Sequence, residues 1–179
     1  MSKLLANLLF ILSFTVSVTA FADKVEMTGD TLQILIPTVA LSSTLVYEKK
    51  SGHNGTQQFV KSLATTLATT AALKEITHKK RPDGNNYKSF PSGHTSATFM
   101  GAAFIHKRYG IKNAILPYVG ATYVAYSRIH AKKHDTIDVI AGAAVGILSS
   151  RYFTTPYKKL SVNPIVESGG LRVQLSKRW

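Results

Sequence analysis

Six apolar stretches alternate with short polar segments along the chain. The first, LLANLLFILSFTVSVTAFA, ends at Ala22, where Asp23 introduces charge. The second covers 31–47 and is almost uncharged, and the charged, glycine-containing segment EKKSGHNG separates it from the third at 56–80. Stretches of this length predict helices, because strands are usually shorter. The remaining three predicted helices cover 92–109, 113–128 and 135–153.

The connections between these stretches predict how the helices are arranged. Pro82 disfavours helical backbone at Arg81, and DGNNYKS after it is a turn-rich loop. Short connections predict antiparallel neighbours, and Gly142 and Gly146 in the last stretch allow close helix approach. We therefore predict an all-α fold, an antiparallel bundle of about five helices plus an N-terminal signal or anchor helix.

The two ends of the chain differ from this bundle. Lys3 followed by an apolar run that ends in Ala20-Phe21-Ala22 is a signal-peptide pattern, and it predicts cleavage after Ala22. An uncleaved transmembrane helix is the alternative, since the run is long enough to span. Apolar residues alternate behind a Ser-Gly-Gly turn in the tail, which predicts an extended segment or a β-hairpin. The predicted division is 1–22 signal or anchor, 23–156 helical domain and 157–179 tail.

Composition limits the partners and the chemistry. The chain has 22 Lys and Arg residues against 9 Asp and Glu, a formal charge of +13, which suits an anionic surface or a phosphorylated substrate. Because the N-terminal pattern directs the protein out of the cytoplasm or into its membrane, nucleic acid is not an expected partner. The absence of cysteine excludes disulfides, thiolate catalysis and cysteine-ligated zinc.

The segment SFPSGHTSA indicates an anion site at the start of a helix. Ser92, Gly93 and His94 precede an apolar run, and a helix start offers unpaired backbone N–H groups and a partial positive charge. Ordinary helix capping by Ser92 explains the same letters.

The other candidates lie at helix ends that an antiparallel bundle brings to one side. Lys74 and Arg81 are near the end of the third stretch, and Arg128 closes the fifth. His134 and Asp138 are four residues apart, which predicts one helical face and a hydrogen bond from an imidazole nitrogen to the carboxylate. Convergence of three cations, two histidines and a carboxylate favours a site for phosphate over scattered surface charge.

Three segments resemble the signature of the type 2 phosphatidic acid phosphatase superfamily: KEITHKKRP, PSGH and SRIHAKKHDTID. The resemblance covers 74–138 directly, and it implies a metal-independent phosphatase without a cofactor. It implies that Lys74, Arg81 and Arg128 hold phosphate with the backbone N–H groups of Ser92 and Gly93. It also implies that His134 attacks phosphorus to form a phosphohistidine, Asp138 orients His134, and His94 protonates the leaving oxygen.

Four other interpretations remain open at this stage. His130, His134 and Asp138 share a spacing that suits a metal site, but that site leaves the cations unexplained. A vanadate-dependent haloperoxidase would bind vanadate with the same cations and His134. A basic interaction protein would have histidines with structural roles alone. A soluble periplasmic acid phosphatase is the alternative to a lipid phosphatase.

Asp135 is expected to face solvent or cap its helix, and Lys79, with the other remaining lysines, is expected to be solvated.

The predicted setting follows from the resemblance and the apolar stretches. We expect a bundle associated with the inner membrane of a Gram-negative bacterium, with its site facing the periplasm. The expected substrates are phospholipid, isoprenoid or lipid A phosphates, as monoesters or pyrophosphates.

Overall fold

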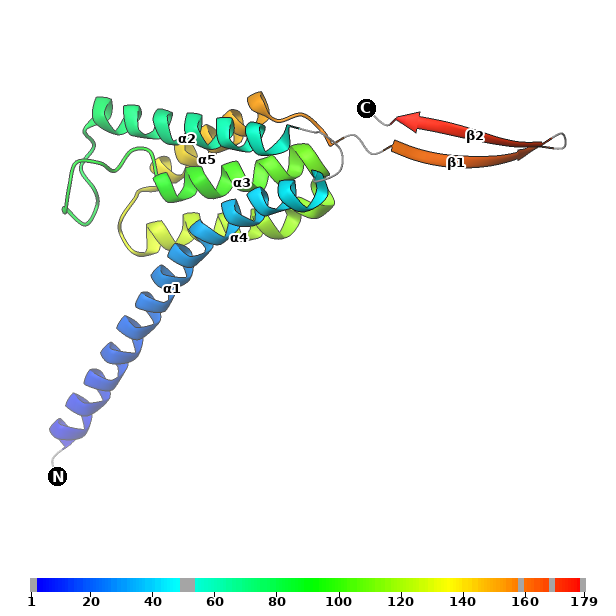
Figure 1. Ribbon diagram of the computed structural model, residues 1–179. Coiled ribbons are helices and arrows are strands. Elements are labelled where there is room, and N and C mark those ends of the chain that lie inside the picture. Colours follow the sequence, from blue (N-terminus) through cyan, green and yellow to red (C-terminus); the bar gives the residue numbers. More distant parts are fainter. Residues whose placement is uncertain (1–2, 49–53, 158–159, 168–169, 178–179) are drawn as a thin grey trace.

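The computed structural model describes residues 3–48, 54–157, 160–167 and 170–177, with side chains described at 23–46 and 54–157. Within these ranges the chain forms five helices followed by a hairpin of two strands (Figure 1). The elements are α1 (Lys3–Glu48), α2 (Gly55–Thr77), α3 (Gly93–Tyr109), α4 (Ile111–His130), α5 (Thr136–Phe153), β1 (Leu160–Glu167) and β2 (Gly170–Lys177).

The predicted all-α bundle is confirmed, but its first two helices are one. Helix α1 continues through Asp23 and the polar letters after it, where a separate N-terminal helix was expected. The hydroxyls of Thr28 and Thr31 bond to backbone carbonyls one turn back, so these polar side chains satisfy themselves without breaking the helix. The polar segment between the first two apolar stretches therefore lies within one continuous helix.

The other helix boundaries lie within a few residues of their predicted positions. Helix α2 ends at Thr77, three residues before the predicted end, because His78 adopts a left-handed conformation and its N–H bonds to Lys74 O. Ser92 is the N-cap of α3, and its side chain accepts a hydrogen bond from Thr95 N–H. Ordinary capping is thus part of what Ser92 does.

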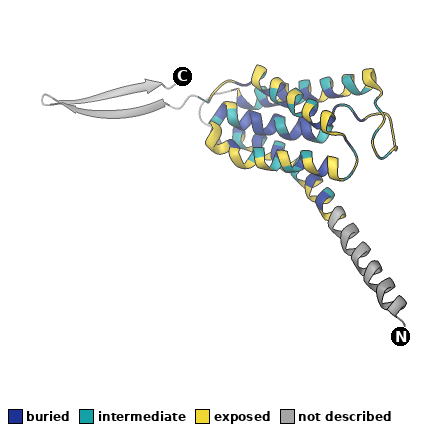
Figure 2. Cartoon of the chain, turned by 180° about the vertical axis from the view of Figure 1, so that it is seen from behind, coloured by how far each residue is buried: buried dark blue, intermediate teal, exposed yellow. Residues whose placement is uncertain are grey.

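Helix α3 lies at the centre of the bundle and is buried along most of its length (Figure 2). Helix α5 packs against it with almost no side chain between them, as the two glycines predicted. A Cβ at Gly142 would lie 2.5 Å from Ser92 O, and one at Gly146 would lie 2.2 Å from Ser96 O. Only glycine permits this approach, and it holds the start of α5 against the start of α3.

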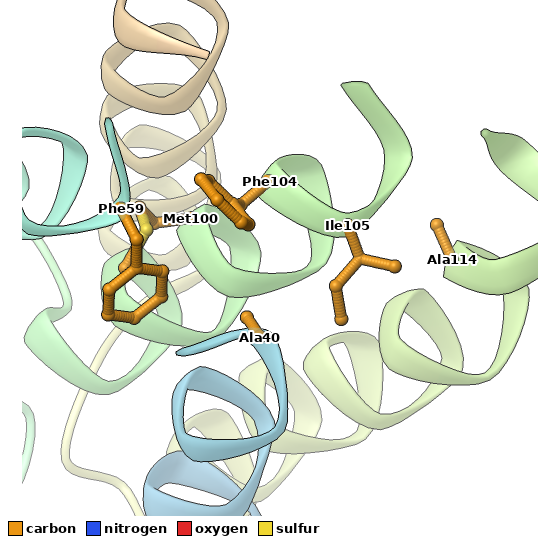
Figure 3. Close-up of a cluster of buried hydrophobic side chains, with 6 residues drawn as sticks. All are labelled: Ala40, Phe59, Met100, Phe104, Ile105 and Ala114. Atoms are coloured by element: carbon orange, nitrogen blue, oxygen red, sulfur yellow. The ribbon is translucent and has the colours of Figure 1, made fainter. Parts of the chain in front are cut away.

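Apolar side chains from α1 to α4 pack around the other end of α3 (Figure 3). Phe59 and Phe104 meet edge to face with ring centroids 5.3 Å apart, and Met100 and Phe104 are fully buried. This cluster, completed by Ala40, Ile105 and Ala114, fixes how the helices cross.

The antiparallel course places four helix ends on one side of the bundle: the ends of α2 and α4 and the starts of α3 and α5 (Figure 1). At the tail, β1 pairs with β2 in antiparallel register from Leu160–Lys177 to Glu167–Gly170, as the predicted hairpin requires. Among the described residues, one segment, Asp23–Val46, is long and apolar enough to cross a membrane.

Candidate active site

Two loops meet at this side of the bundle. The loop that joins α2 to α3 closes on itself, since Arg81 N–H donates to Asn86 O and Ser89 N–H donates to Lys79 O. It also docks on the connection between α4 and α5, where Asp83 N–H donates to Lys132 O at 3.0 Å. These backbone bonds place Arg81 beside the segment that carries the second histidine.

His134 lies in the turn before α5, and its side chain is only 3% exposed. The predicted shared helical face with Asp138 is therefore wrong, because Asp135 is the N-cap and α5 starts at Thr136. The two side chains nevertheless approach, with His134 Nδ1 3.8 Å from Asp138 Oδ2. That distance is an ion-pair contact and too long for the hydrogen bond that the sequence predicted. Accordingly, His134 Nδ1 has no hydrogen-bond partner.

The Asp138 carboxylate is fully buried and its oxygens bond elsewhere. Oδ2 accepts from Ser89 Oγ at 2.5 Å and from Asp135 N–H at 3.0 Å. Oδ1 accepts from Lys79 Nζ at 2.8 Å, and the same ammonium lies 2.8 Å from Asp135 Oδ2. Burial alone would raise the pKa of Asp138, but the hydrogen bonds from Lys79 and Ser89 hold it below its ordinary value.

Lys79 therefore corrects the expectation of a solvated charge. Its pairing with Asp135 also explains how a second carboxylate is tolerated here, because that charge is directed at the ammonium. Sequence reasoning had no signal for Lys79, which is one of several lysines in a basic stretch.

Two predicted phosphate-binding cations reach this region from α2 and its loop. Lys74 Nζ donates to the carbonyls of Lys88 and Pro91, both at 2.7 Å, which fixes the ammonium against the loop. Arg81 Nε is buried without an acceptor. An unpaired buried donor is rare in folded proteins, so the guanidinium is oriented for an acceptor that the described side chains do not provide.

Charge and burial keep His134 neutral. Burial, followed by the charges of Lys74 and Arg81, lowers the pKa of His134 to about 4, although the Ser89 backbone and Asp138 oppose this. Burial and the charge of Arg81 also lower the pKa of Lys74 to about 8. An imidazole that is neutral at pH 5 to 7 has the lone pair that a nucleophile needs.

The first histidine, His94, pairs with a carboxylate from α1. His94 Nε2 is 3.0 Å from Asp30 Oδ1, and the same oxygen accepts from Arg128 Nη1 at 2.8 Å. Arg128 Nη2 donates to Glu26 O at 3.0 Å, and the Arg128 side chain is 4% exposed. A Cβ at Gly29 would lie 2.1 Å from Ser127 Oγ, so α1 passes close to the end of α4.

Sequence analysis missed Asp30. Asp30 is one of four charged residues in DKVEMTGD, between the first two apolar stretches, and nothing in that short segment sets it apart from the other three. Burial, followed by the charge of Arg128, lowers the pKa of His94, and the charge and hydrogen bond of Asp30 partly offset this.

The backbone N–H groups of Ser92 and Gly93, both predicted to bind phosphate, differ in whether they already have a partner. Ser92 N–H donates to Asp138 O at 2.9 Å, which ties the start of α3 to α5. Gly93 is the first residue of α3, where backbone N–H groups have no partner within the helix.

The spacing that suggested a metal site does not bring its residues together on one helix. His130 is the last residue of α4 and stacks on Tyr126 with ring centroids 5.6 Å apart, whereas Asp138 belongs to α5. Among residues 23–46 and 54–157, no group of three His, Asp or Glu side chains has a metal-binding arrangement.

The structure defines a helical bundle with two histidine–carboxylate pairs among its helix ends, and comparison with known families places it. The PAP2 superfamily matches residues 8–160, most of the chain. The chain therefore belongs to the PAP2 superfamily, as its three sequence segments suggested.

The most informative relatives are lipid A phosphatases. The chain is 36% identical over 107 residues to the lipid A 1-phosphatase of Helicobacter pylori strain 26695, which covers 54% of this chain and 55% of the relative. It is 42% identical over 71 residues to the lipid A 1-phosphatase of Porphyromonas gingivalis, 38% of this chain and 16% of the relative. The match thus spans about half of the first relative and a small part of the second.

Two solved structures share the fold. The crystal structure of Aquifex aeolicus LpxE matches with a TM-score of 0.59 at 20% identity, over 72% of this chain and 84% of that one. A transmembrane PAP2-type phosphatidylglycerolphosphate phosphatase from Bacillus subtilis matches with a TM-score of 0.50 at 22% identity, over 86% and 94%.

Proposed function

We propose that this protein is a metal-independent phosphatase that hydrolyses the phosphomonoester or pyrophosphate of a lipid through a phosphohistidine on His134. Lys74, Arg81 and Arg128, with the N–H of Gly93 at the start of α3, hold the phosphoryl group. Fixed cations offset the negative charge of phosphate, which otherwise repels a neutral imidazole that approaches phosphorus.

The reaction proceeds in two steps, formation of a phosphohistidine and its hydrolysis. His134 Nε2, the nitrogen that does not face Asp138, attacks phosphorus while the bond from phosphorus to the leaving oxygen breaks. His94 gives its proton to that oxygen, and Asp138 stabilises the positive charge on the imidazole. Water then attacks the phosphohistidine, loses its proton to His94 and releases inorganic phosphate with His134 restored.

The observation that carries this proposal is the buried Arg81 Nε without an acceptor, close enough to His134, His94 and Lys74 for its charge to lower all three pKa values. A guanidinium offers two N–H groups in the geometry of phosphate oxygens. Family membership and the lipid A 1-phosphatase relatives support a phosphorylated lipid as the substrate.

We further infer that the protein is associated with the inner membrane through Asp23–Val46, with the site facing the periplasm. Helix α1 has 46 residues and a length of about 69 Å, over twice the roughly 30 Å of a bilayer core. A straight helix of that length cannot place both of its apolar halves inside a single bilayer core. This supports removal of 1–22 as a signal peptide, which leaves 23–156 as the phosphatase domain.

The test is a phosphate-release panel with the purified protein in detergent. Lipid A, phosphatidic acid, phosphatidylglycerolphosphate and an isoprenoid pyrophosphate are compared with water-soluble phosphate esters, and His134→Ala is the control. We expect a lipid phosphate to give the highest kcat/KM. Equal turnover by His134→Ala rejects the mechanism, and preference for soluble esters rejects the lipid assignment in favour of a non-specific acid phosphatase.

A further inference from the structure

Lys79 differs from the other cations of the site in its partners, because its ammonium pairs with two carboxylates. Its ammonium lies 2.8 Å from Asp138 Oδ1 and 2.8 Å from Asp135 Oδ2. The Lys79 side chain is 32% exposed, whereas the Asp138 side chain is fully buried. The lysine is thus the direct counter-ion of the carboxylate that faces the nucleophile.

A buried carboxylate next to an imidazole has two possible partners for its charge. Here the Asp138 carboxylate accepts hydrogen bonds from Lys79 Nζ, Ser89 Oγ and Asp135 N–H. His134 Nδ1 lies 3.8 Å away and has no hydrogen-bond partner. If the ammonium were absent, the carboxylate would form its strongest remaining ion pair with a protonated His134. The positive charges of Lys74 and Arg81 oppose that protonation.

We propose that Lys79 is a positioning residue for the nucleophile: as the counter-ion of Asp138 it fixes the carboxylate and takes up its charge, which keeps His134 unprotonated and able to attack in mildly acidic surroundings. The inference rests on the proposed role of His134. It adds a residue that acts through Asp138 without contact to the substrate.

A backbone hydrogen bond between Lys79 and Ser89 supports this arrangement. Ser89 N–H donates to Lys79 O at 2.9 Å, so the residue that anchors Asp138 Oδ1 is itself tied to the residue that anchors Oδ2. The carboxylate is therefore held by one closed unit of the loop between α2 and α3. Burial alone would lower the pKa of Lys79, but its bonds to Asp135 and Asp138 raise it, so the ammonium stays charged throughout the range in which the site works.

The experiment compares three variants of the full chain in detergent: Lys79→Met, Lys79→Arg and, as a matched control, Lys80→Met at the neighbouring exposed position. The dependence of kcat/KM on pH is measured from pH 3.5 to 8. We expect the acidic limb of Lys79→Met to move up by about one pH unit or more, because the His134–Asp138 pair then takes up its proton more readily. Lys79→Arg and Lys80→Met are expected to keep the wild-type limb.

A second measurement does not depend on phosphatase activity. The imidazole of His134 is titrated by NMR in wild type and Lys79→Met, with its signal assigned by its loss in His134→Gln. The same upward movement is expected there, and it would be seen even if the substrate assignment were wrong. An equal loss of activity at every pH, with an unmoved His134 titration, overturns the proposal and leaves Lys79 a structural role. If Lys79→Met does not fold, Lys79→Gln replaces it in both measurements.

Discussion

The site contains two histidine–carboxylate pairs, and they differ in where the carboxylate lies. Asp30 is half exposed and bonds directly to both His94 and Arg128. Asp138 is fully buried, 3.8 Å from His134, and held by Lys79. A carboxylate bonded to its imidazole favours the protonated ring, whereas one already paired with an ammonium does so less. The same two residue types thereby suit an acid on one side and a neutral nucleophile on the other.

The largest expected effect separates the two histidines by leaving group. His134→Gln should lower kcat by about 10⁴-fold or more for every phosphate ester, because no other group forms the covalent intermediate. His94→Gln should lower it by about 10²–10⁴-fold for alkyl phosphates and much less for p-nitrophenyl phosphate, whose leaving group needs no proton. Steady-state phosphate release measures both. Equal sensitivity of both variants to the leaving group would contradict the assigned roles.

Replacement of the buried carboxylate should rank next. Asp138→Asn should reduce kcat by up to about 10⁴-fold, the loss known for the orienting aspartate of serine proteases, since the amide does not stabilise an imidazolium. It also leaves Lys79 paired only with Asp135. Circular dichroism and thermal unfolding establish whether the variant is folded at the assay temperature. Activity within a few-fold of wild type in a folded variant would show that Asp138 serves structure alone.

The pH dependence tests the comparison without a mutation. On the acid side kcat/KM should fall as pH drops through about 4, where His134 becomes protonated and loses its lone pair. On the basic side kcat/KM should decline as pH rises, and the decline should begin at a pH lower than 6.5. The reason is that the pKa of His94 is lowered from 6.5, so the acid loses its proton earlier. Lys74 loses its charge near pH 8 and deepens the decline. Activity should change by about tenfold per pH unit outside these limits.

Substrate phosphate also titrates near pH 6, so the basic limb needs a control. His94→Gln should lack the part of that limb that belongs to the enzyme, and only the substrate titration should remain. An optimum at alkaline pH in the wild type would be incompatible with His94 as the acid.

The smallest effect is expected from Asp30. Asp30→Asn removes the charge that favours protonated His94, so its pKa should fall further and the basic limb should move to lower pH. Near pH 6 we expect kcat/KM to drop by about threefold to tenfold. Asp23→Asn, an exposed acidic residue two turns earlier in α1, is the matched control. A basic limb that stays in place would mean that Asp30 only anchors Arg128 to α1.

The sequence predicted most of the bundle because its signals are local. Runs of apolar residues, Gly142 and Gly146, and the proline at 82 act within a few residues of themselves, and the helices they predicted are present. The boundary predicted near Asp23 is absent, and the contacts made there lie between helices, so hydrophobic periodicity does not reveal them. Helix α1 continues through its polar segment, where Asp30 and the backbone carbonyl of Glu26 accept hydrogen bonds from Arg128 of another helix.

Apart from Lys79 and Asp30, the residue types of the site, their order and the side of the bundle where they meet were determined by the sequence, since alternating helices bring their ends together whatever the side chains do. Which atoms pair was decided only by the tertiary structure. The partners of Asp138 come from the loop at 79 and 89, and the partner of His94 comes from α1, 64 residues away. A hydrogen bond depends on ångström-scale placement of segments distant in the chain, and no local pattern of letters encodes that placement.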